Sequence, residues 1–389
     1  MHWKLPRSIW ALGAVSLLMD TSSELIHSLL PIFMTTVLGA SVLTVGLLEG
    51  IAEATAAVTK VFSGALSDRL RRRKPIVLLG YGLAALTKPL FPLATSTTWI
   101  FAARFVDRVG KGIRDAPRDA LVADMTPASL RGAAYGLRQA LDSAGAVLGP
   151  SLAVVFLIGY SAGIKAVLWI AVVPAAVAVL LLAAGVQEPE RTTHEPALRV
   201  RVTLRLLGQL PARLWQIVAL GAVFTLARFS EAFLVLRAQN VGLAVGYVPI
   251  VMIAMNTVYA AAAYPAGAAA DTVSQRFLLI AGLVVLIAAD ALLAIANGAW
   301  LVLAGAMLWG LHMALSQGLL SKLVADSSPA ELRGTAFGIF NLVIGGALLI
   351  ASVLAGYLWE SVGPAATFIT GAAFAVITLA GVLLWANDA

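Results

Sequence analysis

The sequence predicts an all-α protein that crosses a membrane twelve times. Of its 389 residues, 60% are hydrophobic and only 12% are charged, and the mean hydropathy is +0.91. A soluble domain has about a quarter of its residues charged, so this chain has too little polar surface to face water. Its apolar segments also recur at the length of roughly 20 residues that a helix needs to span a bilayer.

Polar residues, glycines and prolines divide the chain into twelve candidate spans. They fall near 8–36, 43–65, 75–95, 98–124, 133–158, 164–186, 213–238, 246–270, 277–296, 300–325, 335–358 and 364–386. A polar stretch rich in Pro, Glu and Arg separates the sixth span from the seventh. We therefore expect two six-helix bundles, residues 1–186 and 213–389, joined by a connector at 187–212.

The basic residues predict the orientation. The apolar stretch after Lys4 and Arg7 runs to about Val37 without a small-residue cleavage pattern, so it is predicted as a first spanning helix rather than a signal peptide. If the N-terminus is cytoplasmic, the outer loops contain few basic residues beyond Lys165 and Arg237. The positive-inside rule then places both termini and the connector in the cytoplasm, with the chain in the cytoplasmic (inner) membrane. This orientation accounts for most of the net charge of +7.

The two halves of the sequence are repeats. Residues 121–136 align with residues 323–338 without a gap, and eleven of the sixteen positions are identical. A Gly-x-x-x-Asp pattern at 64–68 recurs at 267–271 at nearly the same offset. Two similar six-helix bundles related by an axis along the membrane normal form a carrier architecture, with a substrate cavity between the bundles.

The segment Gly-Ala-Leu-Ser-Asp-Arg-Leu-Arg-Arg-Arg at 64–73 resembles the signature loop between helices 2 and 3 of the major facilitator superfamily. It departs from that pattern at Leu70, where a glycine is common. The resemblance, which covers essentially the whole chain, implies a twelve-helix transporter whose loop latches the cytoplasmic side. The alternative is that the basic cluster is only an orientation signal. The predicted gating residues are Gly64, Asp68, Arg69, Arg72, Arg73, Asp124 and Asp271.

The predicted fifth helix carries spaced glycines, Gly136, Gly145 and Gly149, followed by Pro150. This pattern resembles the fifth-helix motif of proton-coupled antiporters of the family, although the glycine pair that usually follows is absent. The resemblance implies export rather than import. The alternative is ordinary close helix packing with a proline bend.

Ionisable residues within spans cost several kcal/mol at the bilayer centre, so they usually line cavities or pathways. In the first helix, Asp20, Glu24 and His27 lie within an arc of about 60°. A carboxylate here either carries a proton or simply neutralises the bases of the fourth helix. Arg104 stands where the family often has an arginine implicated in proton transfer. The predicted proton-coupling residues are Asp20, Glu24, Glu49, Glu53 and Arg104.

The predicted fourth helix is the most charged. Its five basic residues and two of its aspartates fall within an arc of about 120°, a face that lipid would not tolerate. Arginine and lysine on such a face favour a solute with carboxylate or phosphate groups. The predicted cavity residues, drawn from both halves, are His27, Asp107, Arg108, Lys111, Arg114, Arg118, Asp142, Arg228, Glu231 and Asn256.

Together these features predict a secondary active transporter that exports a small solute in exchange for protons by alternating access, and the basic fourth helix favours an anionic solute. Export of amphipathic drugs or cations, or of a divalent metal or metal chelate held by the first-helix acids and histidine, stays open. A transporter-like sensor is the alternative from another class. We expect no enzyme activity, cofactor, resident metal or nucleic-acid partner, because no nucleophile–base pair, hydrolase spacing or phosphate loop stands out; the absence of cysteine also excludes thiol chemistry. The partners expected are solute, protons and the lipid bilayer, and the resemblance implies a monomer.

Overall fold

The computed structural model describes residues 5–70, 72–127, 130–188, 210–328 and 332–384. All regular structure within these ranges is helical. Ten helices are long and apolar enough to cross a membrane, and they match ten of the twelve predicted spans. The other two predicted spans, 98–124 and 213–238, are also helical. The first is too charged to count as an apolar span, and the second is interrupted.

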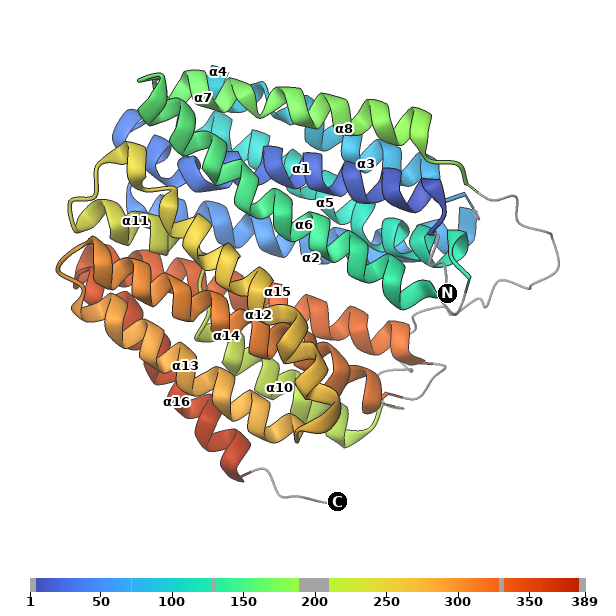
Figure 1. The fold of residues 1–389 in the computed structure, drawn as a ribbon. Helices are drawn as coiled ribbons and strands as arrows, with labels where there is room; N and C mark the ends of the chain where they lie inside the picture. Colours follow the sequence, from blue (N-terminus) through green and yellow to red (C-terminus); the bar gives the residue numbers. More distant parts are fainter. Residues whose placement is uncertain (1–4, 71, 128–129, 189–209, 329–331, 385–389) are drawn as a thin grey trace. The chain divides into compact units, whose positions relative to one another are not determined.

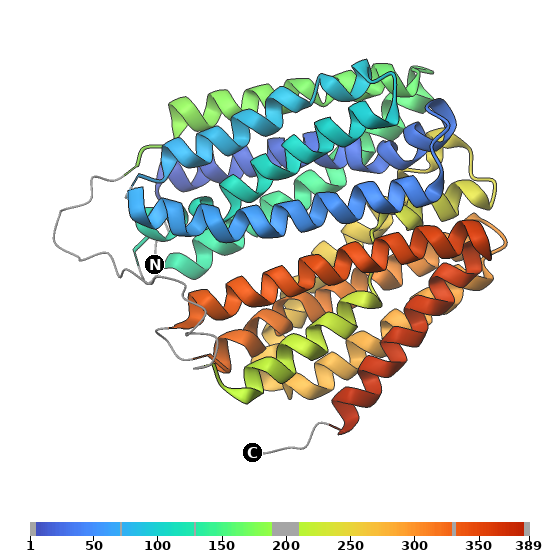
Figure 2. The same ribbon diagram turned by 180° about the vertical axis from the view of Figure 1, so that it is seen from behind.

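By their contacts, the helices divide into two compact units (Figure 1; Figure 2). Unit 1 contains Met1–Gly39 and Thr55–Arg199, and unit 2 contains Ala40–Ala54 and Val200–Ala389. Most of the connector predicted at 187–212 lies outside the described residues, so the predicted bundle limits remain a prediction.

In the first half of the chain, the described residues form eight helices and two π-helical turns. They are α1 (Arg7–Ile32) with the turn Phe33–Val37, α2 (Val42–Leu70), α3 (Lys74–Thr87), α4 (Leu90–Leu93), α5 (Thr97–Met125), α6 (Arg131–Val154) with the turn Val155–Gly159, α7 (Ile164–Ile170) and α8 (Val172–Gly185). The second half forms α10 (Ala212–Leu226), α11 (Ala232–Asn240), a 3-10 turn (Val245–Tyr247), α12 (Ile250–Thr272), α13 (Gln275–Ile295), α14 (Ala299–Asp326), α15 (Arg333–Ser361) and α16 (Pro364–Leu384).

The predicted fourth span is the single helix α5, whose polar residues make it too charged to count as an apolar span. Arg104, Asp107, Arg108, Arg114 and Arg118 of this helix are nevertheless buried. The helix therefore depends on protein partners, because lipid cannot solvate this face.

The predicted seventh span is not continuous. Its two parts, α10 and α11, are separated by the non-helical residues 227–231. We call these five residues the helix-7 interruption. Side chains replace the missing helical bonds there, because the Ser230 N–H donates to Ser352 Oγ (3.2 Å) and the Ala232 N–H donates to Ser230 Oγ (3.2 Å). The expectation of one continuous helix over 213–238 was therefore wrong.

In unit 1, α1 packs against α6 and α8, and α3 packs against α5 (Figure 1). Two glycines let α6 approach α1 closely. A Cβ at Gly145 would lie 2.6 Å from Leu17 O, and one at Gly149 would lie 2.5 Å from Thr21 O. A Cβ at Gly136 would meet nothing within 4 Å. Thus two of the three spaced glycines are positions of close helix contact, and the third is not.

In unit 2, α14 packs against α12 and α13, and α16 packs against α13. The first part of α2 groups with this unit through a close contact with α15: a Cβ at Gly46 would lie 2.3 Å from Ser352 O. Glu49 and Glu53 belong to this part of α2. These two acids are therefore grouped with unit 2, whereas the first-helix acids belong to unit 1.

The glycine contacts make a stability prediction. Gly145→Ala and Gly149→Ala should lower the thermal unfolding temperature of the detergent-purified protein, because overpacking costs about 1–3 kcal/mol. Gly136→Ala is the matched control. Every glycine-to-alanine change within a helix stabilises that helix by up to about 1 kcal/mol, so the control carries the same gain without the overpacking. The control should be neutral or stabilising. Equal effects at all three positions would contradict the close α1–α6 contact.

Candidate functional site

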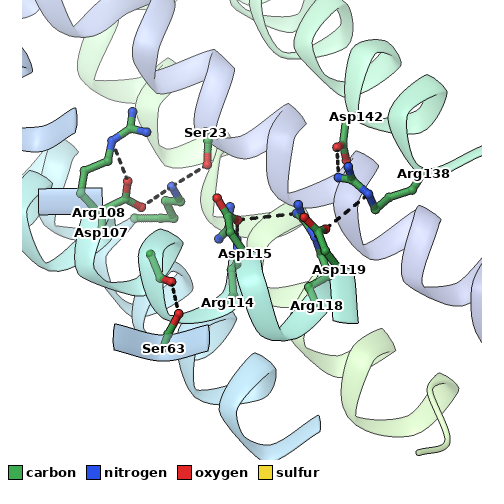
Figure 3. A network of polar contacts seen from close by, with 12 residues as sticks. Ser23, Ser63, Asp107, Arg108, Arg114, Asp115, Arg118, Asp119, Arg138 and Asp142 are labelled. Carbon is green, nitrogen blue, oxygen red and sulfur yellow. Dashed lines mark hydrogen bonds and ion pairs between the residues drawn. The ribbon is translucent and has the colours of Figure 1, made fainter. Parts of the chain in front are cut away.

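A buried charged network on α5 is the candidate functional site (Figure 3). The helix starts at Ser96, whose Oγ accepts a hydrogen bond from the Trp99 N–H (3.3 Å). From Arg104 onward, its charged residues recur three or four positions apart, the spacing that puts side chains on one helical face. The network therefore begins as a sequence pattern, and neighbouring helices complete it.

Two reciprocal glycines bring α3 against α5. A Cβ at Gly80 would lie 2.6 Å from Gly110 O, and a Cβ at Gly110 would lie 2.7 Å from Gly80 O. Helix α2 approaches from another side, where the Ser63 hydroxyl donates to Gly112 O at 2.7 Å. These contacts leave no room for side chains between the backbones, and they set the position of α5 relative to its neighbours.

The α3–α5 contact places Lys88, just after α3, on Asp107. Lys88 Nζ lies 2.8 Å from Asp107 Oδ1 and 3.0 Å from Ser23 Oγ. Asp107 Oδ2 lies 4.0 Å from Arg104 Nη1 and 4.0 Å from Arg108 Nε. Lys88 and Arg104 are each 1% exposed and Asp107 is 4% exposed. One buried carboxylate thus faces three cations.

A second group of charges continues from α5 to α6 (Figure 3). Asp115 Oδ1 lies 3.8 Å from both Arg114 Nε and Arg118 Nη1. Asp119 Oδ1 then joins two arginines, 3.2 Å from Arg118 Nε and 3.7 Å from Nε of Arg138 on α6. Arg138 also pairs with Asp142 one turn further on.

Two cationic groups in this network have capacity left for a ligand. Lys111 is partly exposed, and its charge acts on Glu24 and Asp115 without a hydrogen bond or ion pair to a described residue. Arg114 lies 4.5 Å from the centre of the Tyr81 ring, and its buried Nη1 has no hydrogen-bond partner in the described part of the chain. Buried donors without acceptors are costly, so an anionic group would be stabilised beside them.

The first-helix residues separate into a pair and a lone acid. Glu24 Oε2 lies 3.4 Å from His27 Nδ1. Asp20 lies at the close α1–α6 contact, where a Cβ at Gly145 would be 3.0 Å from the Asp20 Cβ. It forms no hydrogen bond or ion pair with the described residues, and the charges that act on it come from Asp142 and from arginines of α5.

Within the described residues, no group of three or more His, Asp or Glu is arranged to hold a metal ion. The α1 residues that left a metal cargo open in the sequence therefore do not form a metal-binding group here. The remaining predicted cavity residues, Arg228, Glu231 and Asn256, belong to unit 2. Arg228 lies in the helix-7 interruption, 5.6 Å from the centre of the Phe224 ring.

The predicted gating loop is partly described. Arg73 Nε lies 3.1 Å from Asp124 Oδ2, so two of the predicted gating residues form an ion pair. Arg72 is exposed, and a Cβ at Gly64 would make ordinary contact with Ala116. The side chains of Asp68, Arg69 and Asp271 lie outside the described residues.

Sequence reasoning missed several participants. Glu188 accepts hydrogen bonds from the backbone N–H groups of Arg73 and Lys74 at the start of α3. No local pattern signals this contact, because its partners are more than a hundred residues apart. Arg138 could have been found, since it stands four residues before Asp142 on one helix.

The fold and the site define a class: a multi-pass helical membrane protein with a buried, cation-rich face in one bundle. The family model of the major facilitator superfamily matches residues 12–244 and again residues 229–389. The chain therefore belongs to the major facilitator superfamily, whose members carry small solutes across membranes. Two matching segments agree with the internal repeat, and the predicted twelve-helix fold is confirmed.

Relatives cover nearly the whole chain. It is 34% identical over 391 residues to an uncharacterized MFS-type transporter of Methanocaldococcus jannaschii, covering 98% of this chain and 95% of the relative. It is 25% identical over 395 residues to the inner membrane transport protein YajR of Escherichia coli (96% and 82%), and 26% identical over 325 residues to the class D tetracycline resistance protein of Salmonella ordonez (75% and 74%). Among solved structures, a mutant of the nucleoside transporter NupG superposes with a TM-score of 0.80 at 14% identity, over 96% of this chain and 98% of that one.

The Asp107 cluster makes an ordered prediction. Asp107→Asn should destabilise the protein by about 3–5 kcal/mol, because it strips the carboxylate from a buried pair and leaves three cations facing one another. Lys88→Met should cost less, since Arg104 and Arg108 still face Asp107. The measurement is the thermal unfolding of each variant in detergent.

The double variant, Lys88→Met with Asp107→Asn, should be less destabilised than the sum of the two single changes. Lys165→Met is the control, because Lys165 lies outside the network, where it donates to the Ala94 carbonyl (3.3 Å) and lies 5.8 Å from the centre of the Phe33 ring. A larger loss for Lys88→Met than for Asp107→Asn would contradict the three-cation arrangement.

Proposed function

We propose that this protein is a proton-coupled exporter of a small solute that carries an anionic group. The observation that supports the proposal is the buried, cation-rich face of α5. Asp107, Asp115, Asp119 and Asp142 pair with cations there, whereas Lys111 has no ion pair and Arg114 Nη1 has no hydrogen-bond partner among the described residues. The cations are Lys88, Arg104, Arg108, Lys111, Arg114, Arg118 and Arg138.

Buried cationic groups that lack a partner favour an anionic ligand for a physical reason. A charge without a partner is strongly disfavoured in the membrane interior, and a carboxylate or phosphate on the solute supplies the missing countercharge. Lys111 stands between the Asp107 and Asp115 groups and has no ion-pair partner of its own. Arginine forks nearby can grip the same anion in two places.

We assign the coupling proton to Asp20. This acid has no ion-pair partner, yet both Asp142 and arginines of α5 act on it. Glu24, by contrast, is engaged by His27, and Glu49 and Glu53 group with unit 2. A proton on Asp20 removes a negative charge next to the network and so changes how strongly the arginines hold their partners.

Exchange of solute against protons requires a solute that can displace the proton from Asp20. A solute with anionic groups only would favour proton retention on Asp20, and solute and proton would then move together. To displace the proton, the solute also needs a cationic group that can pair with Asp20. A zwitterionic solute meets both conditions, with its anionic end at Lys111 and its cationic end at Asp20.

Export in exchange for protons is supported by the Gly145 and Gly149 contact, which occupies the positions of the antiporter-like pattern on α6. It also agrees with a relative named for tetracycline resistance. The positive-inside distribution supports an inner-membrane location with cytoplasmic termini, and a relative is named as an inner membrane transport protein. The rocking of two bundles about a cavity is the motion that the repeated architecture permits.

Lys111→Ala should abolish thermal stabilisation of the purified protein by zwitterionic and anionic probes, such as amino acids and short dicarboxylates. A ligand that binds the folded state stabilises it by about 2.7 kcal/mol at a hundred times its dissociation constant, so the loss is measurable. Lys165→Ala should keep the stabilisation. If lipophilic cations alone stabilise the protein, with no dependence on Lys111, the anionic-solute proposal is wrong.

Asp20→Asn should uncouple solute from proton movement. In vesicles that hold the solute and a pH-sensitive dye, solute efflux through the wild type should acidify the interior, and efflux through the variant should not. Glu360→Gln, which changes an exposed carboxylate on α15, should behave as wild type. Alkalinisation by the wild type would instead show that solute and proton move together, and an unchanged pH would show that protons are not coupled.

A further inference from the structure

Asp290 on α13 is a buried acid that the proposed function does not use. Its side chain is 0% exposed, and neither carboxyl oxygen has a hydrogen-bond partner in the described part of the chain. It forms no ion pair there either. An ionised carboxylate in such a position carries a large desolvation cost, which a bound proton removes.

The carboxyl lies where three elements of unit 2 meet. A Cβ at Gly371 of α16 would be 2.8 Å from Asp290 Oδ2, 3.0 Å from the Phe229 ring and 3.2 Å from Ala227 O. Both Phe229 and Ala227 belong to the helix-7 interruption. The absence of a side chain at Gly371 therefore makes the space that Asp290 occupies beside the non-helical backbone.

No charged group on the neighbouring helices compensates Asp290. On α11, Arg237 donates to the carbonyls of Leu293 (2.9 Å) and Ala296 (2.8 Å), which close the end of α13 beyond Asp290. Arg237 also bonds to Asn240. Helix α16 contains no titratable residue.

The nearest titratable groups on the remaining elements are also engaged elsewhere. On α14, His312 Nδ1 lies 2.9 Å from Gly282 O, two turns before Asp290 on α13. Because a carbonyl can only accept, Nδ1 carries the hydrogen. In the interruption itself, Arg228 lies over the Phe224 ring, and Glu231 stands at the start of α11.

We propose that Asp290 is a proton-binding site of unit 2, at which the protonated carboxyl donates a hydrogen bond to the backbone of the helix-7 interruption. The Ala227 carbonyl is the acceptor that the geometry offers, since it lies in the non-helical segment and close to the same point as Asp290 Oδ2. A hard metal cation fits poorly, because Ca²⁺ takes six to eight oxygen ligands and an aromatic ring edge forms part of this surrounding.

A proton at this position would act on the conformation of helix 7. The neutral acid can remain between α13, α16 and the interruption, whereas the ionised acid needs water or a countercharge. Discontinuous helices in transporters place backbone groups where they bind substrates and coupling ions. Proton release would therefore be linked to displacement of the interruption from α13 and α16. The inference needs neither the anionic solute nor the role of Asp20.

Infrared difference spectroscopy on the purified, solute-free protein tests the proposal. The carbonyl stretch of a protonated carboxylic acid should be present at about pH 5 and lost at about pH 9, since release exposes the charged form. Measured in the Asp20→Asn background, so that the acid proposed for proton coupling adds no signal, Asp290→Asn should remove this band and Glu360→Gln should leave it in place. Because no solute is added, the result is separate from the outcome of the transport experiments.

Thermal unfolding over the same pH range gives a second measurement. The folded wild type holds a proton that an exposed aspartate in the unfolded chain releases above about pH 4, so its stability should fall as the pH rises. Asp290→Asn keeps the neutral shape and should lose that part of the pH dependence. Gly371→Ala should shift the band, because its Cβ would displace the carboxyl, while Gly381→Ala on the same helix makes only an ordinary contact and should not.

Three results would overturn the proposal. A band that persists unchanged to about pH 9 would make Asp290 a permanently neutral structural acid. A band that survives when Asp290→Asn is combined with Asp20→Asn would belong to another group. Stabilisation of the wild type by Na⁺ instead of acid, lost in Asp290→Asn, would make this a sodium site.

Discussion

The cost of placing charge in a membrane governs the organisation of unit 1. Helix α5 carries more buried charge than lipid could tolerate, and the ion pair between Lys88 and Asp107, 2.8 Å apart, is the centre of the arrangement that makes it possible. That pair depends on the close approach of α3 and α5 at Gly80 and Gly110. Small residues at a helix contact thus determine where a buried carboxylate finds its cation.

The network is built so that pairing is incomplete. A structural network would be expected to match its charges, because a cation left without a carboxylate is destabilising. Here Lys111 lacks an ion-pair partner among the described residues, and Arg114 keeps a buried donor without an acceptor. A binding site can tolerate such a cost when the ligand supplies the missing partner. These two groups therefore support a solute with an anionic group better than a purely structural role.

Unit 2 accommodates its buried polar groups in a different way. Fewer charged residues are buried among its described residues than in unit 1, and Arg237 and His312 are held by backbone atoms rather than by opposite charges. The helix-7 interruption supplies further backbone groups within a predicted span. Asp290 lies beside it without a countercharge, so a proton is the simplest partner that keeps the site neutral. The two proposed proton sites therefore lie in different surroundings, one beside an ion-pair network and one among apolar groups.

The amino-acid sequence by itself determined the helix positions, because apolar length and polar punctuation are local properties. It also predicted the repeat, the charged face of α5 and the glycines at the α1–α6 contact, since these depend on spacing along one helix. It did not predict the helix-7 interruption, whose residues 227–231 contain neither glycine nor proline and whose backbone is held by Ser352 from α15. Nor did it choose Lys88 as the partner of Asp107, group Glu49 and Glu53 with unit 2, or isolate Asp290. Only the tertiary structure decided these points, because each depends on how helices distant in sequence align when they pack.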